Sequence, residues 1–337
     1  MQTDPNATTE ERTAEASLRP ARLSEYHGQP HIQEVLATAI GAARARGEVL
    51  GHQLFYGPPG LGKTTLSHII ANEMGAEVRI TSGPILRTPN DLVGMIATLR
   101  AGDVFFIDEI HRLPMITEEV LYSVMEDFAI DVMVGKGSEK KSIRMPVPRI
   151  TVVGATTRLG SVTEPLRDRF QIVHRLDYYD VQTLVRILHR SASTIHSTLD
   201  QYAAMEIAGR CRRTPRIANR LLMRCRDVAF MRQEPRESDA GAWVASNPAI
   251  RHEDVLQTMK MLRVDELGLE EMDREMMRAM LRDYNGGPVG LKTMAALIGE
   301  PVNTVEDAME PYLMRMGLLA RTPRGRELTE AGRAHIS

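Results

Sequence analysis

One stretch constrains the fold of this chain more than any other, and it reads Gly57-Pro58-Pro59-Gly60-Leu61-Gly62-Lys63-Thr64-Thr65. It matches the phosphate-binding pattern G-x-x-x-x-G-K-S/T at every fixed position. Residues 53–56 before it are typical of a short buried strand, and residues 66–74 after it have the spacing of a helix with one apolar face. Glycines let the backbone curl so that N–H groups point at phosphate oxygens, and the helix N-terminus adds partial positive charge. The pattern therefore predicts a nucleotide-binding loop between a strand and a helix.

The chemistry of this loop depends on a few side chains. Lys63 can reach the outer phosphates, and the Thr64 hydroxyl can ligate Mg²⁺. Further on, four apolar residues at 104–107 predict a strand buried on both faces, and Asp108 and Glu109 follow it directly. Such a strand ends at the ligand crevice of a parallel sheet, where Asp108 can hold hydrated Mg²⁺ and Glu109 can polarise the attacking water. Downstream of a phosphate-binding loop, this arrangement predicts the second half of an ATPase site.

Composition limits the remaining possibilities. A chain of 337 residues predicts two or three domains, and aliphatic residues and the 20 Met must fill their cores because aromatics make up only 4%. No apolar run approaches the roughly 18 residues of a membrane span, and the polar N-terminus has no signal-peptide pattern, so we expect a cytoplasmic protein. A net charge of −2 restricts nucleic-acid binding to a local patch. Cys211 and Cys225 suggest neither a disulfide framework nor a metal site.

The first half of the chain predicts an α/β fold, a parallel sheet with helices on both faces. Residues 1–17 are polar and non-periodic, and we expect them to be disordered. Residues 131–134 and 142–147 alternate apolar and polar around a glycine pair, which predicts a β-hairpin that is either an ordinary surface feature or a docking element. The arginine pair near residue 169 is either a solvated turn or a charge aimed at a neighbouring subunit. The further predicted elements are a helix at residues 120–128 and strands at residues 77–81, 149–155 and 171–176.

The second half changes to helices and ends in a different pattern. Helical spacing recurs at residues 181–193, 201–211, 215–231, from about His252, and at 270–283 and 291–298. Residues 233–248, which include the lone Trp243, predict a loop. A further helix capped by Thr304 and two short strands follow, in the order of a winged-helix module. Three arginines at 321–326 either contact phosphates or form a solvated turn.

Beyond single motifs, the chain closely resembles the RuvB family of Holliday junction branch-migration motors, which are AAA+ ATPases. The resemblance extends from residue 18 to about residue 329. It rests on short sequence segments that, taken together, are specific to the family. They lie at residues 57–65, 81–84, 106–113, 125–128, 154–158, 165–170, 214–222, 286–291 and 321–326.

The resemblance implies a domain order and a set of partners. It implies a large ATPase domain at residues 18–179, a small helical lid domain at 180–260 and a winged-helix head at 261–337. It further implies a homohexameric ring around duplex DNA that uses ATP and Mg²⁺ at the subunit interfaces. The hairpin at residues 131–147 would dock RuvA, and RuvC would join the complex for junction resolution.

The resemblance also assigns roles to individual residues. Thr157 would sense the γ-phosphate, Arg169 would act as an arginine finger in the neighbouring subunit's site, and Arg216 would report the nucleotide state to the lid. Asp108 would hold Mg²⁺ with Thr64, and Glu109 would activate water. The remaining positions form two sets: the nucleotide-contacting residues Leu18, Arg19, Gly60, Gly62, Lys63, Thr65, Glu126, Asp127, Phe128 and Tyr179, and the DNA-contacting residues Arg321 and Arg326.

Two other functions share parts of this pattern. A clamp-loader-like ATPase, which loads another protein and moves no DNA, would have the same nucleotide site and arginine finger. A winged-helix regulator could use bound nucleotide only as a conformational switch. The winged-helix ending argues against the first, and Glu109 with Arg169 argues against the second.

Overall fold

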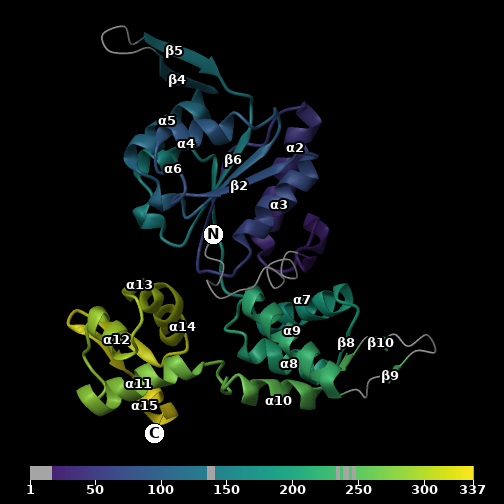
Figure 1. The fold of residues 1–337 in the computed structure, drawn as a ribbon, viewed down its shortest axis with the longest axis vertical. Helices are drawn as coiled ribbons and strands as arrows, with labels where there is room; N and C mark the ends of the chain where they lie inside the picture. The colour runs from purple at the N-terminus through teal and green to yellow at the C-terminus, as the bar shows by residue number, and fades with distance from the viewer. Residues whose placement is uncertain (1–16, 135–140, 233–235, 238–242, 245–247, 337) are drawn as a thin grey trace. The chain divides into compact units, whose positions relative to one another are not determined.

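The structure is a computed structural model that describes residues 17–134, 141–232, 236–237, 243–244 and 248–336 (Figure 1). It divides into two compact units. The first contains the described residues up to 57 and residues 61–177, and the second contains residues 58–60 and the described residues from 178 onward. The expected disordered tail lies outside the described residues except for Ser17. No helix in the described ranges is both long and apolar enough to cross a lipid bilayer.

The first unit is built on a parallel sheet with the strand order β2-β3-β6-β1-β7. Residues 104–107 of β3 and 152–155 of β6 carry no polar side chain and are buried on both faces, the composition expected for central strands of a parallel sheet. The predicted strands are confirmed to within two residues of their ends. The bounds are β1 (Gln53–Tyr56), β2 (Val78–Ser82), β3 (Val104–Asp108), β6 (Thr151–Thr156) and β7 (Ile172–Arg175).

Helices cover both faces of this sheet, with α2 and α3 on one side and α4 and α5 on the other (Figure 1). Leu92 and Leu121 of the second pair pack into one apolar cluster with Phe105 and Val152 of the sheet. The helix predicted at residues 120–128 begins earlier, because Pro114 precedes its first turn in an extended conformation. The bounds are α2 (Pro30–Arg46), α3 (Lys63–Met74), α4 (Pro89–Ile96), α5 (Met115–Glu126) and α6 (Glu164–Asp168).

The predicted hairpin is present. Strands β4 (Ala129–Val134) and β5 (Lys141–Pro146) pair antiparallel, with Ile130 opposite Met145 and Asp131 opposite Arg144. The turn at residues 135–140 lies outside the described residues. Ile143 and Met145 are both about half exposed, at 49% and 48%, so the described part of the hairpin presents apolar side chains to its surroundings.

The second unit begins with a helical module. Its helices are α7 (Val181–Thr194), α8 (Gln201–Arg210), α9 (Pro215–Arg232) and α10 (His252–Met261), and the short strand β8 (Thr198–Leu199) pairs with β11 (Ala249–Ile250). The loop predicted at residues 233–248 is wrong in part, since β9 (Arg236–Glu237) pairs with β10 (Trp243–Val244). The other residues from 233 to 247 lie outside the described ranges.

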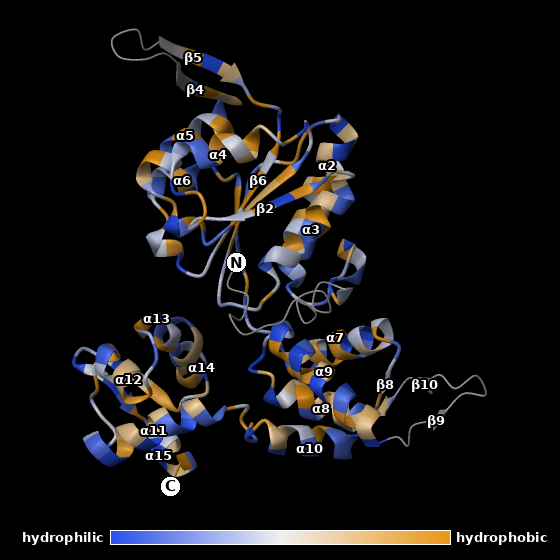
Figure 2. Ribbon diagram, in the orientation of Figure 1, coloured by the Kyte–Doolittle hydropathy of each residue, from blue (hydrophilic) through white to orange (hydrophobic). Residues whose placement is uncertain are grey.

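The winged-helix order predicted for the C-terminal module is confirmed. Its buried core contains as many methionines as leucines, among them Met276, Met277, Met280 and Met294, and Figure 2 shows hydrophobic residues interspersed with hydrophilic ones along this module. Unbranched thioether side chains fill an irregular core of a chain poor in aromatics. The bounds are α11 (Glu271–Tyr284), α12 (Leu291–Leu297), α13 (Val302–Thr304), α14 (Glu310–Arg315), β12 (Leu319–Thr322), β13 (Gly325–Leu328) and α15 (Glu330–Ile336).

The predicted cap at Thr304 is wrong. Thr304 has helical dihedral angles and makes no capping hydrogen bond, because the helix already starts at Val302 after Pro301. The following turn, Val305–Met309, is a π-helix. Pro311 explains this widened turn, since it has no N–H to donate to the carbonyl four residues earlier and its ring would clash there.

A buried histidine predicts how the first unit responds to acid. His174 is 4% exposed, contacts Gln53 Oε1 through Nε2 at 2.7 Å and stacks on Phe55 at 4.8 Å between ring centroids. Burial, and secondarily the charge of His31, lowers the pKa of His174 from 6.5 to about 4. Between pH 6.5 and about 4, His174 binds a proton in the unfolded chain but stays neutral in the folded chain. The contribution of neutral His174 to the free energy of unfolding is therefore present in full above pH 6.5 and is lost as the pH falls towards 4.

We therefore expect the His174→Gln variant to lose less stability between pH 7 and pH 5 than the unmodified protein, by about 2 kcal/mol. Calorimetric unfolding of the full chain at both pH values measures this difference. The exposed His196 gives a control, and His196→Asn is expected to retain the full pH dependence. An identical pH dependence for His174→Gln would show that another group causes the acid sensitivity.

Candidate functional site

The candidate catalytic residues of the first unit, apart from Arg169, lie at one edge of the sheet. Strand β6 lies between β1 and β3, and Tyr56 is in register with Thr156. Gly57 N donates to Thr156 O at 3.2 Å, so the phosphate-binding loop leaves the sheet directly beside the end of β6. Because the strands are parallel, Asp108 at the end of β3 and Thr157 after β6 lie at this same edge.

The loop has the backbone conformation that its glycines predict. Gly57, Gly60 and Gly62 have φ values of +146°, +79° and +100°, which residues with a Cβ rarely adopt. A Cβ on Gly57 would also lie 2.5 Å from Leu176 O. Gly62 precedes the first residue of α3, so the N–H groups of the first turn of that helix begin where phosphate is expected.

Lys63 is 8% exposed, and its Nζ donates to Gly57 O at 2.8 Å. The ammonium group therefore reaches back to the backbone of Gly57, where the loop begins. A bound phosphate would offer this ammonium a charged acceptor in place of a neutral carbonyl, and such charge-assisted hydrogen bonds are about twice as strong as neutral ones.

Glu109 is held in a strained and paired state. Its φ is +49°, and its Oε2 accepts a hydrogen bond from Arg112 Nη1 at 3.0 Å. Asp108 Oδ1 accepts from the Glu109 N–H at 2.9 Å, so the two carboxylates have different partners. Sequence reasoning missed the pairing role of Arg112, although its spacing of three residues from Glu109 was visible. The carboxylate that is the candidate for water activation must exchange Arg112 for water before it can act.

The two threonines at the end of β6 differ in their hydrogen bonds and exposure. Thr156 Oγ1 contacts His111 Nδ1 at 3.0 Å and accepts from Arg158 N at 2.9 Å, and Thr156 is buried. Thr157 is partly exposed at the sheet edge. This division favours Thr157 as the residue that can meet a ligand, with Thr156 and His111 positioning the turn.

The N-terminal segment lies along α3. Leu18 is 2% exposed, and Arg19 Nη1 lies 3.4 Å from His68 Nε2 on α3. Leu23 N donates to Glu73 Oε1 at 3.0 Å, near the end of the same helix. Burial, and then the charge of Arg19, lowers the pKa of His68. The structure therefore brings the predicted nucleotide-contacting residues Leu18 and Arg19 next to the helix that carries Lys63.

Arg169 occupies a second cluster in the first unit. Its Nη2 donates to Glu126 Oε2 at 3.0 Å, its Nη1 donates to Pro165 O at 2.6 Å, and its guanidinium lies 4.1 Å from the Tyr122 ring centroid. Its Nε is buried and has no hydrogen-bond partner among the described residues. Asp127, beside Glu126, pairs with Arg144 of the hairpin at 2.7 Å. Two predicted site residues, Glu126 and Arg169, are thus paired with each other within one chain.

Tyr179 and Arg216 belong to the second unit. Tyr179 is 4% exposed, and its N–H donates to Arg213 O at 3.0 Å. Arg216 lies in the first turn of α9, and its N–H donates to Gly60 O at 3.4 Å, Gly60 being grouped with this unit. Two further arginines of α9 form surface ion pairs, Arg220 with Glu270 at 2.7 Å and Arg224 with Asp227 at 3.2 Å.

On the wing, the structure separates the three arginines of residues 321–326. Arg321 and Arg324 are exposed, whereas Arg326 is 9% exposed and donates through Nε and Nη2 to the two carboxylate oxygens of Glu310, at 3.1 and 2.8 Å. The expectation that Arg326 is presented to DNA does not match this arrangement, because its guanidinium is committed to a buried carboxylate. Exposed Arg324, which we did not assign as a contact, is better placed for one.

The donors at the sheet edge fit a magnesium–nucleotide complex. The described residues contain no group of three or more His, Cys, Asp or Glu side chains that could hold a metal on their own. Mg²⁺ in phosphate-transfer sites needs only one or two protein oxygens, since substrate phosphates and water supply the rest. Asp108 and the Thr64 hydroxyl are such oxygens. The fold and this edge together define a P-loop nucleoside triphosphatase of the AAA+ class, with a helical lid and a winged-helix module.

Comparison with known proteins gives a family for this fold and site. Models of the Holliday junction DNA helicase RuvB P-loop domain, the RuvB AAA lid domain and the RuvB C-terminal winged helix domain match residues 18–176, 179–265 and 266–337. A protein of Limosilactobacillus reuteri described as Holliday junction branch migration complex subunit RuvB is 49% identical over 327 residues, which are 97% of this chain and 93% of that protein. The protein of Chloroflexus aurantiacus with the same description is 48% identical over 333 residues, which are 99% and 91% of the two chains.

Solved structures agree with this result. The structure of the Thermotoga maritima RuvB Holliday junction branch migration motor superposes with a TM-score of 0.82 at 43% identity, covering 95% of this chain and 98% of that one. The chain belongs to the RuvB family, and it is accordingly a P-loop AAA+ ATPase with a winged-helix domain.

The Arg326–Glu310 pair predicts a structural role for one wing arginine. Removing Arg326 leaves Glu310, 3% exposed, as an uncompensated buried charge, so we expect Arg326→Met to lower the stability of the head by about 3–5 kcal/mol. Exposed Arg321 is the matched control, and Arg321→Met is expected to change stability by no more than about 0.5 kcal/mol. Calorimetry or urea unfolding of the full chain measures both variants. Equal, small changes for the two would contradict the buried pairing.

Proposed function

We propose that this protein is an ATP-driven motor that moves Holliday junctions by translocating duplex DNA through a homohexameric ring. The observation that carries the proposal is the near full-length match, at 48–49% identity, to proteins described as subunits of the Holliday junction branch migration complex. The arrangement of Lys63, Asp108 and Glu109 at one sheet edge supports it, because a motor requires hydrolysis as well as nucleotide binding. We further propose the domain division 18–179, 180–260 and 261–337 and a cytoplasmic location.

In this proposal the chain's residues divide the ATPase chemistry. The N–H groups from Gly60 to Thr65 and the Lys63 ammonium bind the phosphates, and Asp108 and Thr64 would hold Mg²⁺, which would neutralise phosphate charge. Glu109 leaves Arg112 and orients the attacking water, and Thr157 contacts the γ-phosphate. Leu18, Arg19 and Tyr179 contact the rest of the nucleotide, and Arg216 senses it from the start of α9.

Arg169 is proposed to act on ATP bound to the neighbouring subunit. An arginine supplied in this way stabilises the charge that develops in the transition state and raises the rate by about 10³–10⁵. Glu126 holds Arg169 in the single chain, so the neighbour's triphosphate must compete with a carboxylate for this guanidinium. Glu126, Asp127 and Phe128 are then proposed to lie at the same subunit interface.

The head and the hairpin are proposed to bind the partners. A motor that acts on arbitrary sequence should contact phosphates rather than base edges, and exposed Arg321 and Arg324 suit that task. Half-exposed Ile143 and Met145 on the hairpin suit a protein partner, which we propose is RuvA. RuvC is proposed to join this complex when a junction is resolved.

The direct test is movement of a synthetic four-way junction in the presence of ATP, Mg²⁺ and the cognate RuvA. We expect movement with the unmodified protein and none with Lys63→Ala, which loses the phosphate-binding ammonium. Glu109→Gln is expected to bind ATP but to lower hydrolysis and junction movement together, by at least about 10². ATP hydrolysis without any junction movement would instead favour a clamp-loader-like switch.

Phosphate contacts by the wing predict a salt effect. We expect Arg324→Ala to weaken binding of the full chain to two unrelated duplex sequences equally, and to reduce the slope of log affinity against log salt by about 1. Fluorescence anisotropy at several salt concentrations measures the slope. Arg282→Ala, at an exposed arginine of α11 that pairs with its neighbour Asp283, is the control and should leave the slope unchanged. A loss confined to one of the two sequences would exclude a phosphate contact.

A further inference from the structure

The turn between α8 and α9 is strained and tightly held. Arg212 and Arg213 are consecutive residues with a Cβ, and both have positive φ, +51° and +58°. Such conformations cost free energy and persist only where the surroundings enforce them. Cys211 before them is fully buried, and Thr214 after them is 5% exposed. The turn is therefore fixed by its contacts. One set of contacts involves Tyr179 and α9, and the other involves the winged-helix head.

The first set of contacts involves residues proposed to contact the nucleotide. Arg213 O accepts the Tyr179 N–H at 3.0 Å, so the turn fixes the backbone of Tyr179. Thr214 O accepts the N–H of Ala218, in the first turn of α9, at 3.1 Å, and Arg216 lies between them. A shift of Tyr179 or Arg216 must therefore move this turn.

The second set of contacts reaches the winged-helix head through the side chain of Arg212, which is 11% exposed. Its Nε donates to Gly268 O at 3.0 Å, and its Nη2 pairs with Asp273 on α11. Its guanidinium also lies 5.5 Å from the ring centroid of Tyr312 on α14. Asp273 is 2% exposed and accepts the Glu270 N–H at 2.8 Å, so the same carboxylate caps α11 and binds Arg212.

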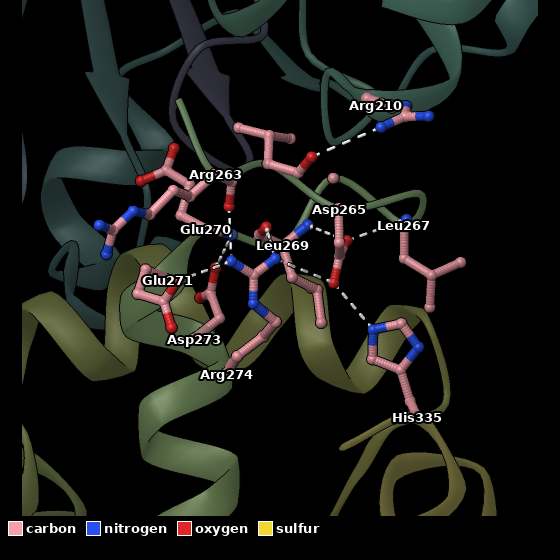
Figure 3. A network of polar contacts seen from close by, with 12 residues as sticks. Arg210, Arg263, Asp265, Leu267, Leu269, Glu270, Glu271, Asp273, Arg274 and His335 are labelled. Carbon is pink, nitrogen blue, oxygen red and sulfur yellow. Dashed lines mark hydrogen bonds and ion pairs between the residues drawn. The ribbon is translucent and has the colours of Figure 1, made fainter. Parts of the chain in front are cut away.

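The segment between α10 and α11 is itself immobilised by hydrogen bonds, as Figure 3 shows. Asp265 Oδ1 accepts the N–H groups of Leu267 and Leu269, at 3.0 and 2.8 Å, and its Oδ2 lies 2.8 Å from His335 Nε2 on α15. Arg274 of α11 donates to the carbonyl oxygens of Arg263 and Leu269, at 2.6 and 3.2 Å (Figure 3). Side chains of Asp265 and Arg274 thus bind N–H and carbonyl groups of this segment. Because its backbone is held by these hydrogen bonds, the segment lacks the freedom expected of a flexible hinge.

Gly268 adds a steric reason for close contact between the two modules. Its φ is +75°, and a Cβ at this position would overlap Arg210 O at the end of α8. Arg210 also donates to Val264 O at 3.4 Å (Figure 3). The backbone of the connecting segment therefore lies directly against the lid helix, within reach of Arg212.

From these contacts we propose that Arg212 is a positioning residue that couples the lid to the head, so that nucleotide-driven movement of the strained turn is transmitted to the DNA-binding wing. The proposal rests on the proposed motor function and adds to it the residue that links the two modules. The burial of the Arg212–Asp273 pair supports this proposal. When a buried ion pair separates, water cannot solvate the two charges, so the separation is costly. Arg220 pairs with Glu270 of the same segment but is 48% exposed, and water can replace that contact.

The environment of Asp273 agrees with this role. Burial raises the pKa of Asp273, and the Arg212 charge is the main factor that lowers it again. Without Arg212, the carboxyl would either take up a proton or turn towards water. Either response removes the buried ionic contact between the lid and the head, and leaves only the exposed pair of Arg220 with Glu270.

The test compares Arg212→Met, which keeps the aliphatic length but removes the charge, with Arg220→Met as the matched exposed control. For each full-length variant, ATP hydrolysis, thermal unfolding and movement of a four-way junction with the cognate RuvA are measured. We expect Arg212→Met to hydrolyse ATP within about twofold of the unmodified protein but to move about tenfold fewer base pairs per ATP. Arg220→Met is expected to leave the ratio unchanged.

A second variant covers the case in which Arg212→Met does not fold. Asp273→Asn keeps the volume and an oxygen that can cap α11, yet loses the charge, and the same fall in base pairs moved per ATP is expected. An unchanged ratio in a folded Arg212→Met or Asp273→Asn variant overturns the proposal. A parallel loss of ATP hydrolysis and junction movement overturns it as well, since that result shows a structural role only. If the unmodified protein moves no junction, the proposed function fails instead.

Discussion

The parallel pairing of β1 with β6 is the constraint on which the catalytic edge depends. Their register places the phosphate-binding loop beside Thr157, and β6 in turn pairs with β3, which ends at Asp108. All three strands are buried, so a register shift would move apolar side chains of both faces at once. The sheet therefore fixes the relative positions of these candidate residues before any ligand is present.

Ion pairs play different roles in different parts of this chain. Arg326 with Glu310 and Arg212 with Asp273 are buried, and each connects elements that are distant in sequence. Glu109 with Arg112 and Arg169 with Glu126 have partly exposed members and engage residues proposed to act on ATP. Buried pairs are costly to break, whereas partly exposed pairs can exchange one partner for another. The chain thus combines permanent connections with pairs that a ligand can open.

The sequence predicted the elements better than it predicted the partners of side chains. Strands with runs such as residues 104–107 and the loop at 57–65 carry local patterns, so their positions followed from a few residues. The early start of α5 and the π-helical turn before Glu310 depend on Pro114 and Pro311, because each proline alters the turn beside it in a way that helical spacing alone does not show. The burial of Arg326 could not be predicted, because nothing local relates it to Glu310, which lies 16 residues earlier on another element.

The contact between Arg169 and Glu126 has a consequence for the assembly of the protein. If Arg169 completes a neighbour's site, then Glu126 acts as an internal competitor that occupies the guanidinium as long as the protomer is alone. Ring closure then exchanges one anion for another, so that hydrolysis and oligomerisation become a single linked equilibrium. Specific activity per protomer would rise with protein concentration, and a free protomer would hydrolyse little ATP.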